Sequence, residues 1–190
     1  MCSIIGYSGL ESAAPILVKG LQKMEYRGYD SVGIATKSGK KIVLKKGVGK
    51  VVEVNNSIML DTLPGNIGIG HTRWATHGKV TEKNAHPHSS NSGKIAIAHN
   101  GIIENFEELK SELQNKGYKF QSETDTEVIA NLIQLNFDET TDIKQSIMKT
   151  VNQLKGHYSF VVIFEDGTLV AARFHEPLII GVGKNSHYIS

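Results

Sequence analysis

The sequence predicts an α+β fold in which helices cover antiparallel sheet. Short apolar runs recur along the chain, and several are separated by turn signals of two or three residues, which is typical of β-hairpins. Other segments repeat apolar side chains at helical spacing. Hairpin-linked strands build antiparallel sheets, and amphipathic helices must bury one face, so a layered arrangement is expected.

The first half of the chain is expected to begin with a strand and a helix. A hairpin turn at Ser38-Gly39 should join the next two strands. The polar stretch at 72–93 is too long for a simple connection, so it should be a binding loop. Strands are expected at 2–7, 31–36, 41–45 and 66–71, and helices at 11–24 and 51–60.

The second half is expected to be a strand, three helices and three further strands. Asn105 with Glu108, and Thr124 with Glu127, have the spacing of helix N-terminal capping pairs. The turn at 165–167 should close a hairpin. Strands are expected at 94–99, 158–164, 168–173 and 178–181, and helices at 106–116, from 124 onward and at 142–154.

Size and composition favour one globular domain over residues 1–190, because 190 residues with 39% hydrophobic side chains can bury a sizeable core. No apolar run approaches the length of a membrane span. The net charge is +2, with lysines scattered among acidic residues, so neither a nucleic-acid nor a membrane partner is expected. There is no secretory signal and only one cysteine, and the cytoplasm is therefore the expected compartment.

That single cysteine, Cys2, follows the initiator Met1. Removal of Met1 would give one residue a thiol and a free α-amine, whose ordinary pKa near ~8 lets it act as the base for the thiol. The alternative interpretation is a small buried side chain that opens the first strand. Cys2 alone does not decide between them.

Three further segments could complete a site for acyl transfer. Asn100-Gly101 offers a side-chain amide and an unhindered backbone N–H, which together could form an oxyanion hole. Arg73 could bind a carboxylate and Asp125 an ammonium group, so an amino acid could be held with its side-chain amide near Cys2. The alternatives are a surface ion pair for Arg73, a core position for Trp74 and a helix-dipole role for Asp125.

Five histidines lie between His71 and His99, which raises the question of a metal site. A structural zinc site would usually recruit cysteine, and no His-Glu-x-x-His motif is present. We therefore expect no metal and no cofactor. The histidines, His86 among them, should support the loop by hydrogen bonds.

Together these segments closely resemble the glutaminase domain of the glucosamine-6-phosphate synthase family. The resemblance implies the four-layer αββα sandwich of N-terminal-nucleophile hydrolases, with mainly antiparallel sheets, and cysteine-dependent hydrolysis of L-glutamine to glutamate and ammonia. The matching blocks follow the family's order and are 2–7, 25–33, 71–78, 84–88, 99–105 and 122–127.

The resemblance also implies roles for individual residues. Cys2 would be the nucleophile and, through its amine, the base, and Asn100 and Gly101 would form the oxyanion hole. Trp74 would gate the passage of ammonia and Arg27 would support the nucleophile. The residues implied to hold glutamine are Arg73, Thr76, His77 and Asp125.

The family's synthase half, two sugar-isomerase domains that bind fructose 6-phosphate, would follow beyond Ser190. The chain alone is therefore expected to hydrolyse glutamine without making the amino sugar, and a homodimer is compatible with the full-length enzyme. The sequence departs from the family at Ser3, which usually is glycine, and at 173–177. An alternative is a catalytically silent module that binds glutamine for regulation or assembly, and a third is a histidine-based metal domain.

Overall fold

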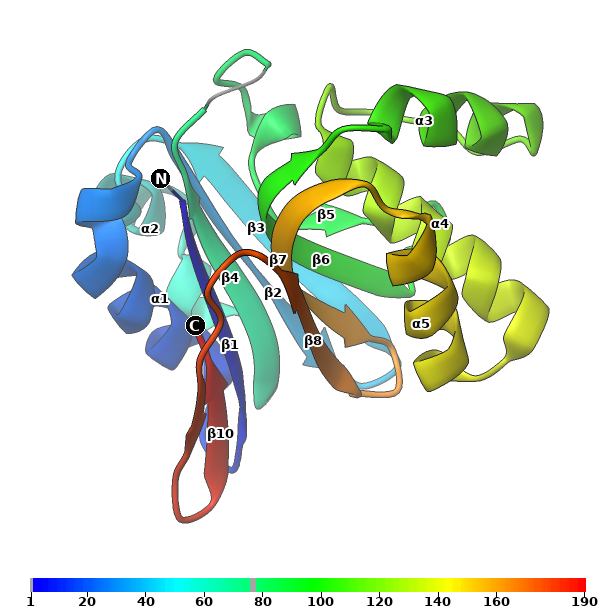
Figure 1. Ribbon diagram of the computed structural model, residues 1–190. Helices are drawn as coiled ribbons and strands as arrows, with labels where there is room; N and C mark the ends of the chain where they lie inside the picture. Colours follow the sequence, from blue (N-terminus) through cyan, green and yellow to red (C-terminus); the bar gives the residue numbers. More distant parts are fainter. Residues whose placement is uncertain (1, 76–77) are drawn as a thin grey trace.

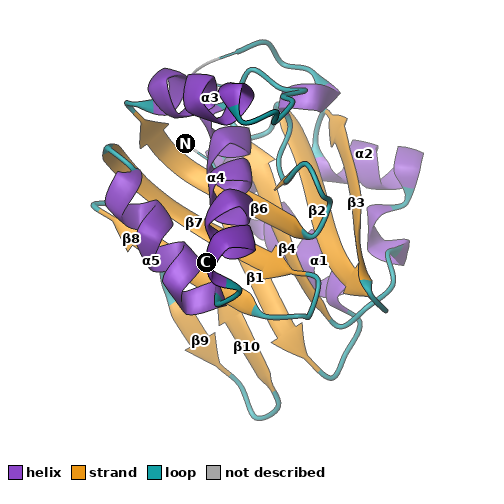
Figure 2. Cartoon of the chain, turned by 90° about the vertical axis from the view of Figure 1, so that its right-hand side faces the viewer, coloured by secondary structure: helices purple, strands orange, loops and turns teal. Residues whose placement is uncertain are grey.

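Two antiparallel sheets lie face to face, with helices on both outer sides (Figures 1 and 2). The computed structural model describes residues 2–75 and 78–190. The larger sheet has the strand order β3-β2-β4-β1-β10-β9, and the smaller has the order β5-β6-β7-β8. The predicted α+β class and its αββα layering are confirmed.

The first sheet and its helices come mostly from the N-terminal half. Their bounds are β1 Ser3–Gly9, α1 Ala13–Met24, β2 Ser31–Ser38, β3 Lys41–Val48, α2 Val51–Ile58 and β4 Ile67–Arg73. The strands β9 Ile180–Val182 and β10 Ser186–Ile189 return from the C-terminal end to extend this sheet. Short 3₁₀ turns are at Glu25–Arg27, Leu60–Thr62 and Glu82–Asn84.

The second sheet and its helices follow in the chain. Their bounds are β5 His88–Ser89, β6 Ile95–Ile103, α3 Phe106–Asn115, α4 Asp125–Thr140, α5 Ile143–Gln153, β7 Gly156–Phe164 and β8 Leu169–Phe174. In the described part of the chain, no helix is both long enough and apolar enough to cross a membrane.

Three buried clusters hold the layers together. Leu17 and Leu21 of α1 pack under the larger sheet, and Ile129 and Ile133 of α4 pack on the smaller one. Between the sheets lies a separate cluster of small and branched side chains. Because alternate residues of a strand point to opposite faces, each sheet contributes side chains to two of these clusters. The members between the sheets are Ile4, Ala35, Ile69, Ala96, Ala98, Val161, Ile163 and Ile189.

Two predicted helix caps are wrong. Asn105 precedes α3, but its side chain bonds the loop at Gln153 and Lys155 instead of capping the helix. Thr124 precedes α4 without a capping bond. The carboxylate of Glu127 accepts hydrogen bonds from the backbone of Ser122 at 2.7 Å and from its hydroxyl at 2.6 Å. A long-range contact of Asn105 and a local contact of Glu127 therefore replace the caps that the spacing suggested.

Candidate active site

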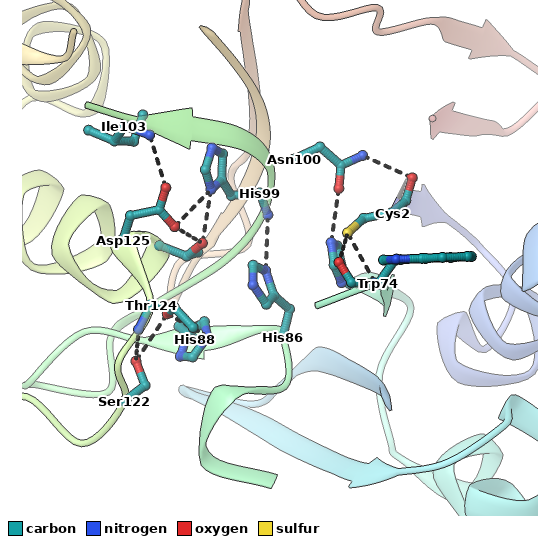
Figure 3. A network of polar contacts seen from close by, with 12 residues as sticks. Cys2, Trp74, His86, His88, His99, Asn100, Ile103, Ser122, Thr124 and Asp125 are labelled. Atoms are coloured by element: carbon teal, nitrogen blue, oxygen red, sulfur yellow. Dashed lines mark hydrogen bonds and ion pairs between the residues drawn. The ribbon is translucent and has the colours of Figure 1, made fainter. Parts of the chain in front are cut away.

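Cys2 stands just before β1, at the edge of a cavity between the two sheets and α4. The register of β1 on β4 pairs Ser3 with Thr72, which brings Cys2 beside Trp74. The Trp74 backbone N–H donates to the Cys2 Sγ at 3.3 Å (Figure 3). Burial raises the pKa of the Cys2 thiol above its usual range, and the bond to the Trp74 backbone opposes this only partly. At neutral pH the thiol is therefore protonated, and a nucleophilic role requires a base.

Asn100 and Gly101 lie within β6, and the prediction that this strand ends at His99 is wrong. The strand continues to Ile103 because β7 pairs with it along its whole length, with Asn100 opposite Ser159. Gly101 has a φ of +119°, and a Cβ there would lie 2.1 Å from the backbone oxygen of His157. Glycine is thus required for the close approach of the strands, and the Asn-Gly pair makes no turn.

The Asn100 amide is directed at the nucleophile. Its Nδ2 donates to the backbone oxygen of Cys2 at 3.4 Å, and its Oδ1 lies 2.9 Å from His71 Nε2. Arg27 Nε donates to the same Cys2 oxygen at 3.4 Å. Residues from β6 and from the 3₁₀ turn at Glu25–Arg27 therefore converge on the Cys2 backbone, and the catalytic and supporting roles of Asn100 and Arg27 stay predictions.

Arg73 and Asp125 line the same cavity as Cys2. Arg73 ends β4 and is 95% buried, with 5% of its surface exposed, and its Nη1 donates to the Lys79 backbone at 3.3 Å. Asp125 opens α4, and its Oδ2 accepts a hydrogen bond from the Ile103 N–H at 2.9 Å. Its other oxygen is 3.8 Å from His99 Nδ1 (Figure 3). Asp125 therefore ties α4 to β6 while it faces the cavity.

Trp74 is not a core residue, because 46% of its surface is exposed. Its ring and that of Tyr29 meet in an edge-to-face arrangement at a centroid distance of 5.4 Å. The predicted binding residues Thr76 and His77 lie outside the described residues. Trp74 thus lines the cavity with a partly exposed ring, and its role as a gate stays a prediction.

The four described histidines from His71 to His99 are buried and hydrogen-bonded. Burial lowers their pKa values, that of His71 to about 3, so these rings are neutral near pH 7. Among the described residues, no three His, Cys, Asp or Glu side chains are grouped as metal ligands would be. The contacts are His71–Asn100 at 2.9 Å, His86–His99 backbone at 3.4 Å, His88–Thr124 at 3.0 Å and His99–Thr126 at 2.9 Å.

Two further residues support this site although no motif in the sequence points to them. His71 contacts the Asn100 amide, and the carboxylate of Asp30 accepts a hydrogen bond from the Ala75 N–H, at the start of the loop after β4. Both lie within the matching sequence blocks, but only the fold shows their partners. The departure at Ser3 is accommodated, since its hydroxyl donates to the Met24 backbone at 3.2 Å.

Known proteins with similar sequences and folds identify the family of this chain. A family model described as "Glutamine amidotransferase domain" matches residues 71–190. The glutamine--fructose-6-phosphate aminotransferases [isomerizing] of Pyrococcus horikoshii and Aquifex aeolicus are 51% and 46% identical over 192 aligned residues, which cover 100% of this chain and 32% of each relative. The chain thus spans about a third of the length of these curated relatives.

Solved structures show the same fold. The glutamine phosphoribosylpyrophosphate amidotransferase of B. subtilis, in complex with ADP and GMP, superimposes with a TM-score of 0.85 at 33% identity, over 100% of this chain and 41% of that one. The structure of the allosteric regulatory enzyme of purine biosynthesis superimposes with a TM-score of 0.86 at 34% identity, with the same coverage of the two chains. With the matched family model, these findings show that the chain belongs to the glutamine amidotransferase domain family.

Proposed function

We propose that the chain hydrolyses L-glutamine to glutamate and ammonia through a γ-glutamyl thioester on Cys2. The observation that carries this proposal is that one cavity brings together the only cysteine, the amide of Asn100 and two side chains of opposite charge, Arg73 and Asp125. A thiol, an oxyanion donor and two groups suited to an amino-acid zwitterion are the parts that amide hydrolysis needs.

The reaction would begin with attack of the Cys2 Sγ on the amide carbon of glutamine. Once Met1 is removed, the α-amine of Cys2 takes the thiol proton, which the raised pKa of the thiol makes necessary. Asn100 Nδ2 and the Gly101 N–H would stabilise the oxyanion. The amine then returns the proton to the leaving nitrogen, so that the C–N bond breaks and ammonia departs. Water, deprotonated by the same amine, hydrolyses the thioester and frees the thiol.

Substrate binding would use charged and polar side chains around the cavity. Arg73 is proposed to hold the α-carboxylate of glutamine and Asp125 its α-ammonium, with Thr76 and His77 completing the contacts. Trp74 would cover the cavity and gate the departure of ammonia. Arg27 would support the Cys2 backbone, and His86 would support the floor of the site.

In a longer protein, the ammonia would serve a synthase part. The curated relatives are named for fructose 6-phosphate, and this chain corresponds to about a third of them. We infer that residues 1–190 form one glutaminase domain, that sugar-isomerase domains accompany it in the complete enzyme, and that the ammonia is destined for fructose 6-phosphate there. A homodimer of the complete enzyme and a cytoplasmic location belong to the same proposal.

The test combines glutamate release with covalent labelling by a diazo-ketone analogue of glutamine. We expect release of glutamate and, by intact mass, loss of Met1 and one adduct, which peptide mapping should place on Cys2. Because Cys2 is the only cysteine, the adduct has no competing thiol. A chain that has lost Met1 and binds glutamine in calorimetry, but releases no glutamate and forms no adduct, would instead support a silent binding module.

Asp125→Asn is expected to raise the KM for glutamine about 10- to 100-fold and to change kcat by no more than about threefold, because an ammonium group loses a charged partner worth roughly 1.5–3 kcal/mol. The asparagine can still accept the bond from Ile103, so α4 should stay in place. Asp138→Asn, on an exposed part of the same helix, is the matched control. An unchanged KM in the Asp125 variant would contradict the ammonium assignment.

A further inference from the structure

The orientation of the Asn100 amide follows from its two neighbours. The backbone oxygen of Cys2 can only accept a hydrogen bond, so the amide end that faces it at 3.4 Å must be the donor Nδ2. The other end, Oδ1, then faces His71 Nε2 at 2.9 Å. Because Oδ1 can only accept, His71 must carry its proton on Nε2.

The surroundings of His71 hold its ring in this position. His71 belongs to β4 of the larger sheet and is 1% exposed, whereas Asn100 belongs to β6 of the smaller sheet. The His71 ring stacks on His86 with a centroid distance of 4.1 Å and an interplanar angle of 15°. Nδ1 of His71 is buried and has no hydrogen-bond partner in the described part of the chain. A neutral imidazole with one N–H therefore has Asn100 as its acceptor.

We propose that His71 is a positioning residue for glutamine hydrolysis, which holds the Asn100 amide so that its Nδ2 points toward the reacting carbonyl. The inference rests on the proposed function. An amide has almost the same shape in its two orientations, but only one presents a donor to the oxyanion. The hydrogen bond from His71 selects that orientation before the substrate arrives, as preorganised stabilisation requires.

Loss of this bond should act on kcat rather than on binding. His71→Phe keeps an aromatic ring for the stack on His86 but removes the N–H, and kcat should fall about 10- to 100-fold, less than the loss of a whole oxyanion donor. KM should change by no more than about threefold, because Arg73 and Asp125 are untouched. His71→Gln offers a new N–H donor and should recover most of the activity. His187→Phe, at an exposed position on β10, is the matched control.

A double variant separates positioning from a general structural role. In an Asn100→Ala background, His71→Phe should lower kcat no further, because the group that it orients is gone. Multiplicative losses in the double variant, or a raised KM with unchanged kcat in His71→Phe, would overturn the proposal.

Nitrogen NMR of the wild-type protein with ¹⁵N-labelled histidine gives a test that needs neither turnover nor a folded variant. The proposal requires the His71 ring to be protonated at Nε2 and unprotonated at Nδ1 between pH 6 and 8, where a pKa of about 3 keeps it neutral. Protonation at Nδ1 would overturn the proposal, because the Asn100 amide would then be turned around. This result is independent of the glutamate-release assay, so failure of the proposed function remains distinguishable.

Discussion

Cys2→Ala is expected to lower kcat for glutamine hydrolysis by roughly 10⁴-fold or more, because no other thiol in the chain can form the thioester. The structure sharpens this expectation. The thiol contacts only the Trp74 backbone among the hydrogen bonds described, accepting from the Trp74 N–H at 3.3 Å and donating to the Trp74 carbonyl oxygen at 3.6 Å, and it is not part of a buried cluster of the core. Alanine should therefore remove the nucleophile with little change in the thermal midpoint of unfolding. Glutamate release and calorimetric unfolding measure the two effects.

Binding provides the control for this variant. Arg73 and Asp125 also line the cavity and are unchanged in this variant, so Cys2→Ala should still bind glutamine in calorimetry. Its Kd for glutamine should lie within about threefold of the wild-type KM. The diazo-ketone adduct should vanish with the thiol. Undiminished glutamate release by the processed Cys2→Ala chain would rule out the thioester mechanism.

Much of the fold could be predicted because its signals are local. Ser38-Gly39 marks a hairpin, and β2 and β3 pair in the predicted order, with Gly39 at a φ of +59°. The turn at 165–167 likewise joins β7 and β8. Where the side chain expected to form a cap has another hydrogen-bond partner, the capping pattern failed. The bonds of Asn105 to the loop before β7, and those of Glu127 to Ser122, could not be read from spacing alone.

The limits of strands were harder to predict because a partner strand decides them. Asn100 and Gly101 have low strand preference, yet β6 includes both since β7 supplies hydrogen bonds along its edge. The final strand β10 has only four residues and was not predicted. It forms because β1 pairs with it, with Gly6 opposite Ile189.

The site, like the fold, has features that are visible in the sequence and others that depend on contacts between distant segments. Cysteine behind the initiator methionine, an Asn-Gly pair and an aspartate at a helix start are visible as residue types, and the structure brings all of them to one cavity. Their supports are not visible, because Asn100 and His71 belong to different sheets and meet only when the sheets face each other. Reactive residue types could therefore be predicted from the sequence, whereas the contact of His71 with Asn100 depends on how the two sheets pack.

Gly101→Ala is expected to destabilise the protein by about 3 kcal/mol or more and to remove most glutamine hydrolysis. At a φ of +119° an alanine is strained, and its Cβ would lie 2.1 Å from the His157 backbone oxygen, so β6 and β7 would have to separate there. That movement would displace the Gly101 N–H and the adjacent Asn100 from the oxyanion position, and each displaced donor should cost about 10²–10³-fold in kcat. Chemical denaturation and glutamate release, measured on the folded fraction, record both effects.

Gly156→Ala separates the loss of stability from the loss of glutamine hydrolysis. Gly156 lies on β7 with the same φ of +119°, and its Cβ would come 2.2 Å from the Ile102 backbone oxygen, so the destabilisation should be similar. Gly156 does not line the Cys2 cavity, and its folded fraction should keep most of its kcat. Gly117→Ala has a φ of +90° with open space around it, so it should carry only the conformational strain. Equal losses of kcat in the Gly101 and Gly156 variants would mean that strand separation, rather than a displaced oxyanion donor, inactivates the enzyme.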